Sequence, residues 1–150
     1  MPSAFRDYFN QAIAGSIDAS YRQNRDENEA YRGLAARQAA HPEPDEAQRR
    51  ALIEKAKTIL PPKIEHYAAL MGVHPTRVTI TGARTRFGSC SGKNAISFSW
   101  QLMQYPEEAI DYVVVHELAH IRHHDHSAAF YRFIASVMPD HEARRALLRQ

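Results

Sequence analysis

The chain has 150 residues, of which 44% are hydrophobic and 24% are charged, and this composition fits one compact domain with a buried core. Its formal net charge of +2 is too small to indicate a nucleic-acid partner, and a single cysteine excludes an internal disulfide framework. No apolar run is long enough to span a bilayer, and residues 1–9 lack the continuous apolar segment of a secretory signal. We therefore expect a soluble, cytoplasmic protein.

The N-terminal part of the chain is predicted to be helical. Residues 3–40 are polar, rich in Ala, Arg, Glu and Gln, and contain no proline. Apolar side chains recur at helical spacing over residues 5–13, and residues 26–40 carry a weaker stripe of the same period. We expect residues 1–44 to form a helical extension beside a second domain of residues 45–150.

A proline-rich boundary opens this second domain. Pro42 and Pro44 disfavour helix on their N-terminal side, and Asp45 can cap a helix that follows. An apolar stripe at helical spacing begins there, and Pro61-Pro62 interrupts it. The pattern predicts a helical hairpin or a kinked helix over residues 46–72, and the helix is expected to end near Gly72.

The period then changes from that of a helix to that of a strand. Residues 77–81 and 95–100 alternate apolar with polar side chains, as half-buried strands do. Residues 85–91 between them are predicted to form another strand, which runs into a turn at Gly92-Lys93-Asn94. We therefore expect a small, mainly antiparallel sheet, and the fold class is α+β.

The sequence His116-Glu117-Leu118-Ala119-His120 has the pattern HExxH, in a segment that should become helical after Pro106. Four residues advance an α-helix by about 400°, so the two imidazoles share one face, about 6 Å apart along the axis. Glu117 projects from the adjacent face, where it can take a proton from a metal-bound water. Apolar residues surround the pair on every side, which disfavours a surface helix with coincidental histidines. The pattern predicts a buried metal-binding helix.

The third ligand must come from beyond the end of this helix. In a continuous helix His126 would lie about 240° around from His120 and would not reach the same ion. We therefore expect a break over residues 122–125, which tolerate left-handed or capping conformations, and a new helix capped by Ser127. His116, His120 and His126 are the favoured triad, and three protein ligands leave a fourth position for water, as in catalytic zinc sites. The remaining candidates for the third ligand are Glu108, His123, His124, Asp125, His141 and Glu142.

Several separated motifs follow one another in the second domain. They are residues 85–91 (Thr-Arg-Phe-Gly-Ser-Cys-Ser), Ile96-Ser97 with Trp100, residues 111–120, His126-Ser127 and Phe130-Tyr131. In this order they resemble the signature of the YgjP-like zinc metallopeptidases, which are related to the SprT and WLM groups of the zincin fold. The resemblance covers about residues 45–150. The chain departs from the family pattern at Phe87 and Tyr131, where tryptophan is usual, and in its helical N-terminal part.

The resemblance implies a zincin-like fold in which the sheet packs on the HExxH helix. It also implies His116, His120 and His126 as ligands of Zn²⁺ and Glu117 as the catalytic acid/base. In this fold an edge strand binds an extended peptide, and residues 86–90 are our candidate for that strand.

The favoured function is therefore a zinc-dependent metallopeptidase that acts on a peptide or protein substrate. Zinc lowers the pKa of its bound water towards about 7, and Glu117 would remove the proton and later pass it to the leaving amine. The resulting hydroxide would attack a carbonyl carbon polarised by the metal. Arg86, Tyr112 and Tyr131 are candidates for a second oxyanion donor, and Arg86 and Tyr131 are the candidate substrate-binding residues.

Two other functions stay open. One is metal-dependent hydrolysis of nucleoside triphosphates at the same site, since a nucleotide pyrophosphatase activity has been assigned within the family. Arg84, Arg86 and Lys93 offer charge for the phosphates. The other is a non-catalytic, zinc-stabilised binding module, which is disfavoured because a structural zinc site normally fills its fourth position with a protein ligand.

Two weaker motifs point to other enzyme classes. The G-x-C-x-G pattern around Cys90 fits a nucleophile elbow, but an elbow needs a helix directly after the nucleophile, and here a strand pattern follows. Met138-Pro139 is similar to the Met-turn of the metzincins, yet the glycine typical of that clan is replaced by His123. We interpret Cys90 as a packing or supporting residue and Met138 as a core methionine.

Overall fold

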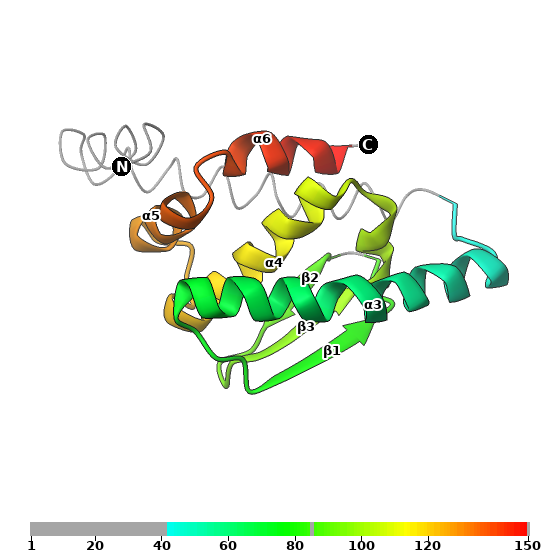
Figure 1. Cartoon of the computed structure of the whole chain (residues 1–150), viewed down its shortest axis with the longest axis horizontal. Helices are drawn as coiled ribbons and strands as arrows, with labels where there is room; N and C mark the ends of the chain where they lie inside the picture. The colour runs from blue at the N-terminus through cyan, green and yellow to red at the C-terminus, as the bar shows by residue number, and fades with distance from the viewer. Residues whose placement is uncertain (1–41, 85, 150) are drawn as a thin grey trace.

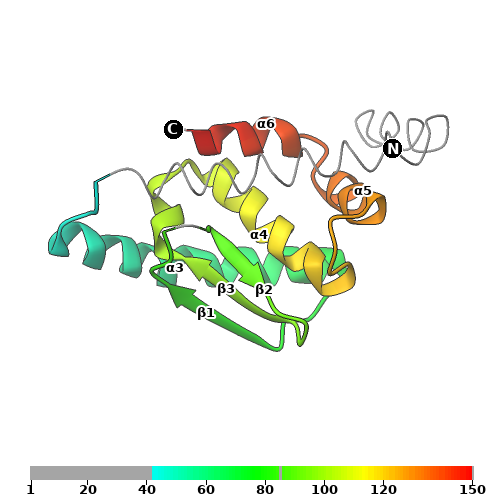
Figure 2. The same cartoon turned by 180° about the vertical axis from the view of Figure 1, so that it is seen from behind.

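The computed structural model describes residues 42–84 and 86–149, which form an α+β fold of helices around a small sheet. The helices are α3 (Glu46–Met71), α4 (Glu107–Arg122), α5 (Ala128–Val137) and α6 (His141–Ala146), the strands are β1 (Arg77–Thr81), β2 (Gly88–Cys90) and β3 (Ala95–Ser99), and the 3-10 turns are η1 (Trp100–Gln104) and η2 (Leu147–Arg149). In Figures 1 and 2, α4 lies between the sheet and α6. The fold class is confirmed, whereas the helices expected before residue 41 lie outside the described residues. No helix in the described part of the chain is long and apolar enough to cross a membrane.

Helix α3 begins and ends at the residues that the sequence predicts. The Asp45 carboxylate accepts a hydrogen bond from the backbone N–H of Gln48 at 2.8 Å, and the Gln48 side chain accepts one from the N–H of Asp45 at 2.9 Å. This reciprocal pair is a capping box. At the other end Gly72 adopts the left-handed conformation, with φ 68°, which favours glycine.

Pro61-Pro62 lies inside α3, which is one helix, so the helical-hairpin alternative is wrong. The prolines lack an N–H, and the carbonyls of Lys57 and Thr58 therefore lose their helical hydrogen bonds. Both prolines and both carbonyl-bearing residues are exposed, so water can bond those carbonyls. Leu60 and Ile64, by contrast, are buried in the core. Burial of this apolar side offsets the missing bonds and keeps the helix continuous.

The sheet has the strand order β1-β3-β2, with β1 parallel and β2 antiparallel to β3. It is a mixed sheet, and its longer pairing is the parallel one, so the expectation of mainly antiparallel pairing is wrong. Alternation of apolar and polar residues sets the two faces of a strand but carries no information about its direction. The turn predicted between β2 and β3 is present, and Asn94 in it has a positive φ of 65°.

The core lies between the sheet and the helices. The pairing register places Ile80 of β1 beside Phe98 of β3, on the face that the helices cover, whereas Val78 near the start of β1 is 40% exposed. Helix α4 starts directly after Pro106, as predicted, and its residues from Ala109 to His120 are all buried except Asp111. The helix that carries HExxH is therefore enclosed on all sides.

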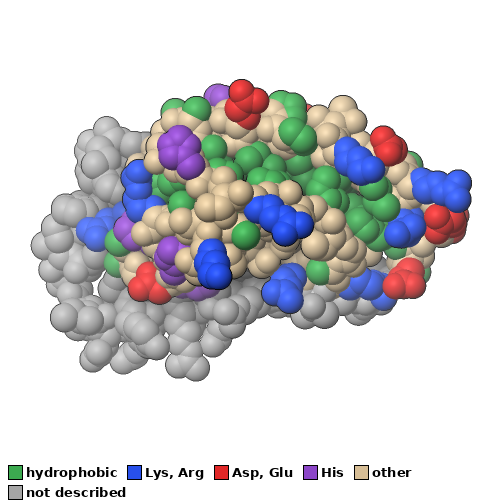
Figure 3. Space-filling view, turned by 90° about the horizontal axis from the view of Figure 1, so that it is seen from below, with side chains coloured by type: hydrophobic (Ala, Val, Ile, Leu, Met, Phe, Trp, Pro, Cys, Tyr) green, Lys and Arg blue, Asp and Glu red, His purple; other side chains and the backbone are tan. Residues whose placement is uncertain are grey.

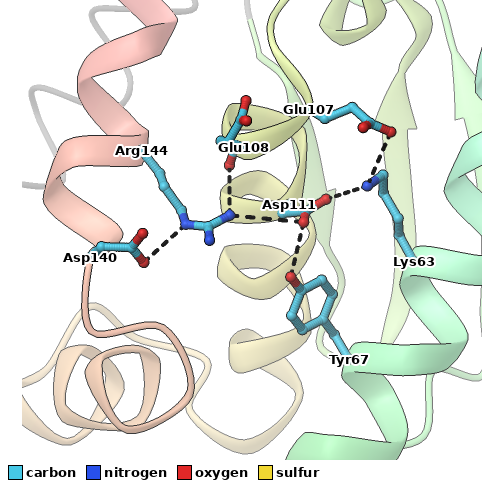
Figure 4. A network of polar contacts seen from close by, with 7 residues as sticks. All are labelled: Lys63, Tyr67, Glu107, Glu108, Asp111, Asp140 and Arg144. Carbon is cyan, nitrogen blue, oxygen red and sulfur yellow. Dashed lines mark hydrogen bonds and ion pairs between the residues drawn. The ribbon is translucent and has the colours of Figure 1, made fainter. Parts of the chain in front are cut away.

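Asp111 is the centre of a polar network that joins three helices (Figure 4). Lys63 and Tyr67 reach it from α3: Lys63 Nζ lies 2.6 Å from Oδ1, and the Tyr67 hydroxyl donates to Oδ2 at 3.0 Å. Arg144 of α6 lies 3.8 Å from Oδ2 and also pairs with Asp140 at 2.9 Å. Burial and the Asp111 carboxylate raise the pKa of Tyr67 to about 12, so Tyr67 remains a hydrogen-bond donor. The network fixes α3 and α6 against α4.

We expect Asp111→Asn to lower the free energy of unfolding by about 1–3 kcal/mol, because it leaves two half-buried cations without their shared anion. Glu107→Gln is the matched control, since it removes the same charge from a side chain that is 67% exposed, and we expect a loss below about 0.5 kcal/mol. Urea unfolding of both variants measures the difference. Equal losses would contradict a central role for Asp111.

Candidate metal centre

Three histidine side chains converge at the C-terminal half of α4. His116 and His120 come from the helix itself, and His126 comes from the connection to α5. Their potential ligand nitrogens all lie within 4.8 Å of one another, and no other such cluster exists within residues 42–84 and 86–149. The structure thus brings together the favoured triad of the sequence. This cluster contains none of the other candidates for the third ligand, which are Glu108, His123, His124, Asp125, His141 and Glu142.

His126 reaches the other two histidines because the chain leaves the helix after Arg122. The C-cap residue His123 is extended, with φ −132° and ψ 101°, and α5 starts only at Ala128. Ser127 caps α5 by accepting a hydrogen bond from the N–H of Phe130 at 3.3 Å. The predicted break and cap are confirmed. Of the two conformations that residues 122–125 tolerate, the capping one occurs: His123 is the C-cap, and among the described non-glycine residues Asn94 alone has a positive φ.

The Nδ1 atoms of the two histidines of α4 make contacts that orient their rings. His120 Nδ1 lies 3.0 Å from the backbone oxygen of His123, and His116 Nδ1 lies 3.3 Å from the hydroxyl of Tyr112. When each Nδ1–H donates to its oxygen, Nε2 keeps its lone pair for a metal ion. Phe130 stacks on His120 with ring centroids 4.3 Å apart and holds that ring from the other side.

Burial also sets the charge of these rings. His116 and His120 are only 1% and 8% exposed. Burial holds the pKa of His116 well below its usual range, with a smaller contribution from the neighbouring His120 and His126, and burial likewise lowers the pKa of His120. Both imidazoles are therefore neutral at neutral pH, the form that binds a metal. Three imidazoles at this separation fit a divalent ion such as zinc.

Glu117 is buried against β2 beside the triad. Its side chain is 2% exposed and lies over Gly88. A Cβ at Gly88 would stand 2.9 Å from Glu117 Cγ and 2.8 Å from the backbone oxygen of Ser97, closer than real contacts allow. The strand thus approaches α4 closely only because residue 88 has no side chain. Sequence reasoning missed this role, although a glycine inside a strand pattern is a signal of close backbone approach.

Cys90 lies on the same side of β2 as Gly88. Burial and the Glu117 carboxylate raise the pKa of the Cys90 thiol to about 11, so the side chain is not a thiolate at neutral pH. A turn and β3 follow it, as predicted, rather than the helix of a nucleophile elbow. Cys90 packs against the core and supports the strand.

The three candidates for an oxyanion donor occupy different environments. The Tyr112 hydroxyl contacts the rear nitrogen of His116, which makes Tyr112 a support for that ring. Tyr131 is buried, and its ring centroid lies 6.4 Å from that of His126. Arg86 is exposed and lines a groove on the sheet. Tyr112 and Tyr131 thus lie beside the triad, whereas Arg86 lies on the sheet.

Comparison with known families identifies the chain. A family model described as YgjP-like, metallopeptidase domain, matches residues 6–150. The chain belongs to the YgjP-like metallopeptidase family. Membership makes it part of a family of metal-dependent peptidases, and its helices and small mixed sheet fit the zincin-like fold expected of that family. No curated protein and no solved structure matches the chain. The boundary between residues 44 and 45 stays a prediction, since the match also includes most of the N-terminal part.

We expect His126→Ala to lose most of its bound zinc in the presence of a weak chelator, because two imidazoles remain where three converge. His124→Ala is the matched control, since His124 is exposed and bonds Asn94 instead. Elemental analysis should give about one zinc per chain for the wild type and for His124→Ala. Full zinc in His126→Ala would contradict the triad.

Proposed function

We propose that the chain is a zinc-dependent metallopeptidase in which His116, His120 and His126 hold the metal and Glu117 carries the proton. The observation that supports this most directly is the set of three histidine nitrogens within 4.8 Å of one another beside a buried HExxH glutamate. Family membership supports the peptidase class. Zn²⁺ is the metal that suits three imidazole ligands and an HExxH helix best.

The residues divide the chemistry as follows. A bound zinc ion would supply Lewis acidity, which acidifies water and polarises a carbonyl. Glu117 follows the first histidine on α4 and is held against β2, so it can accept the proton of the attacking water and return it to the leaving nitrogen. The apolar surroundings of α4 keep bulk water away from this transfer.

A peptide can add to the outer edge of β2, which pairs with no other strand in the described part of the chain. Ser91 N–H donates to Ala95 O at 2.9 Å, and Ser99 N–H donates to Phe87 O at 2.8 Å. Hydrogen-bonded and non-hydrogen-bonded pairs alternate in an antiparallel ladder, so the backbone groups of Gly88 and Cys90 point away from β3. An extended substrate can bond these groups and lie beside Glu117.

The two alternatives have less support. Of the cations considered for a nucleotide, Arg84 is already paired with Glu43 at 3.4 Å. A purely structural zinc site would need a fourth protein ligand, and the cluster in the described residues has three members.

We expect Glu117→Gln to lose peptide hydrolysis by about 100-fold or more while its zinc content stays at the wild-type value, because an amide cannot accept the proton. Turnover of a quenched peptide library and elemental analysis of the same samples measure the two properties. Undiminished hydrolysis by the variant would refute the role of Glu117.

Gly88→Ala tests the close approach of β2 to Glu117. The added methyl group must displace Glu117 or the strand, and a displacement of about 1 Å costs on the order of 100-fold in rate, with zinc retained. Gly92→Ala is the matched control, because no atom lies within 4 Å of a Cβ at that position. Equal rates for the two variants would show that Gly88 does not position Glu117.

A further inference from the structure

The face of the sheet that points away from the helices carries a row of hydroxyl groups. The register aligns Thr79, Ser97 and Ser89 across the three strands, on the side opposite to Ile96 and Phe98. Ser89 Oγ and Ser97 Oγ lie 2.6 Å apart. These residues line a shallow groove of about 420 Å³.

Two arginines border this groove without a balancing acid. Arg77 opens β1 and Arg86 precedes β2, and both side chains are exposed. No carboxylate forms an ion pair with either arginine in the part of the chain that the structure describes, whereas the nearby Arg84 pairs with Glu43. Seen from below, some Lys and Arg side chains stand over the middle of the molecule, where no Asp or Glu side chain is visible (Figure 3). The groove is therefore positively charged.

The groove is within reach of a peptide bound at β2. Side chains alternate between the two faces of a sheet, and neighbouring strands share this alternation. A substrate residue opposite Gly88 or Cys90 thus projects towards α4, and one opposite Ser89 projects towards the outer face. The substrate residue opposite Ser89 therefore reaches the groove, while the residue opposite Gly88 or Cys90 faces Glu117.

We propose that this groove selects substrates by binding a carboxylate side chain, so that the preferred substrate is an extended peptide with Asp or Glu at the position that projects onto the outer face. Guanidinium groups bind carboxylates with two parallel hydrogen bonds, and the adjacent hydroxyls can donate further ones. The inference rests on the proposed peptidase function and names its substrate class.

Binding to Glu117→Gln tests the groove separately from catalysis. Fluorescent peptides of one sequence, with Glu, Gln or Lys placed at each position in turn, are titrated into the zinc-loaded variant and followed by anisotropy. We expect one position at which Glu binds roughly three- to tenfold tighter than Gln, with a smaller ratio at 1 M salt than at 0.1 M. Glu and Gln bound equally at every position would overturn the proposal.

Arginine variants in the same background locate the preference. Arg77→Gln with Arg86→Gln should bring the Glu-to-Gln ratio close to one, whereas Arg50→Gln, an exposed arginine in α3, should leave it intact. A Glu-to-Gln ratio that survives the double variant would overturn the assignment to these arginines. Displacement of the acidic peptide by ATP at a concentration lower than that of the peptide would also overturn it, because it would indicate a phosphate site. If the protein binds the acidic peptide more tightly but the wild type does not hydrolyse it, the proposed role of the groove is supported and the peptidase proposal is refuted.

Discussion

The burial of α4 is the constraint on which the candidate site depends. His116, His120 and Glu117 are almost completely buried, so their polar atoms need partners inside the protein. The Tyr112 hydroxyl and the His123 carbonyl serve the outer nitrogens of the two imidazoles, which leaves the inner nitrogens for a metal. The same burial keeps the rings neutral. Apolar packing around one helix thus determines both the direction and the charge of the ligands.

The ends of α4 are fixed by polar contacts with α3, which explains how the third histidine acquires a definite place. Asp111 joins the first half of α4 to Lys63 and Tyr67. At the other end Arg122 donates to the carbonyl of Met71 at 3.2 Å, and its guanidinium lies 4.6 Å from the ring centroid of Phe133 in α5. The helix therefore ends next to α5, and the chain that turns between the two helices places His126 beside His116 and His120. The position of His126 thus depends on contacts that lie far from the three histidines.

The sequence could predict the features that depend on local spacing. The HExxH pair, the break that follows it and the glycine stop of α3 all involve residues a few positions apart, and the structure has each of them. The sequence left open whether Pro61-Pro62 divides the helix or is tolerated inside it, because this depends on which side of α3 faces water. The direction of β1 was equally inaccessible, since strand pairing brings distant residues together. A glycine inside a strand pattern signals a close approach at Gly88, but it does not identify Glu117 as the neighbour. Local patterns therefore predicted the convergence of the three histidines better than the surroundings of Glu117.

The two sides of β2 have different physical limits, and this difference bears on selectivity. On the side of α4, residue 88 has no room for a side chain, so this point of the strand cannot be varied to distinguish one substrate from another. On the outer side, Ser89 and the two arginines of the groove face solvent. A change of charge there would alter the proposed binding of substrate, and the sheet and salt would screen it from the buried histidines. Under the two proposals, β2 would hold Glu117 in place with one face and recognise substrate with the other. Selectivity that resides on the outer face can change without loss of the buried geometry, because the residues that carry it do not pack against α4.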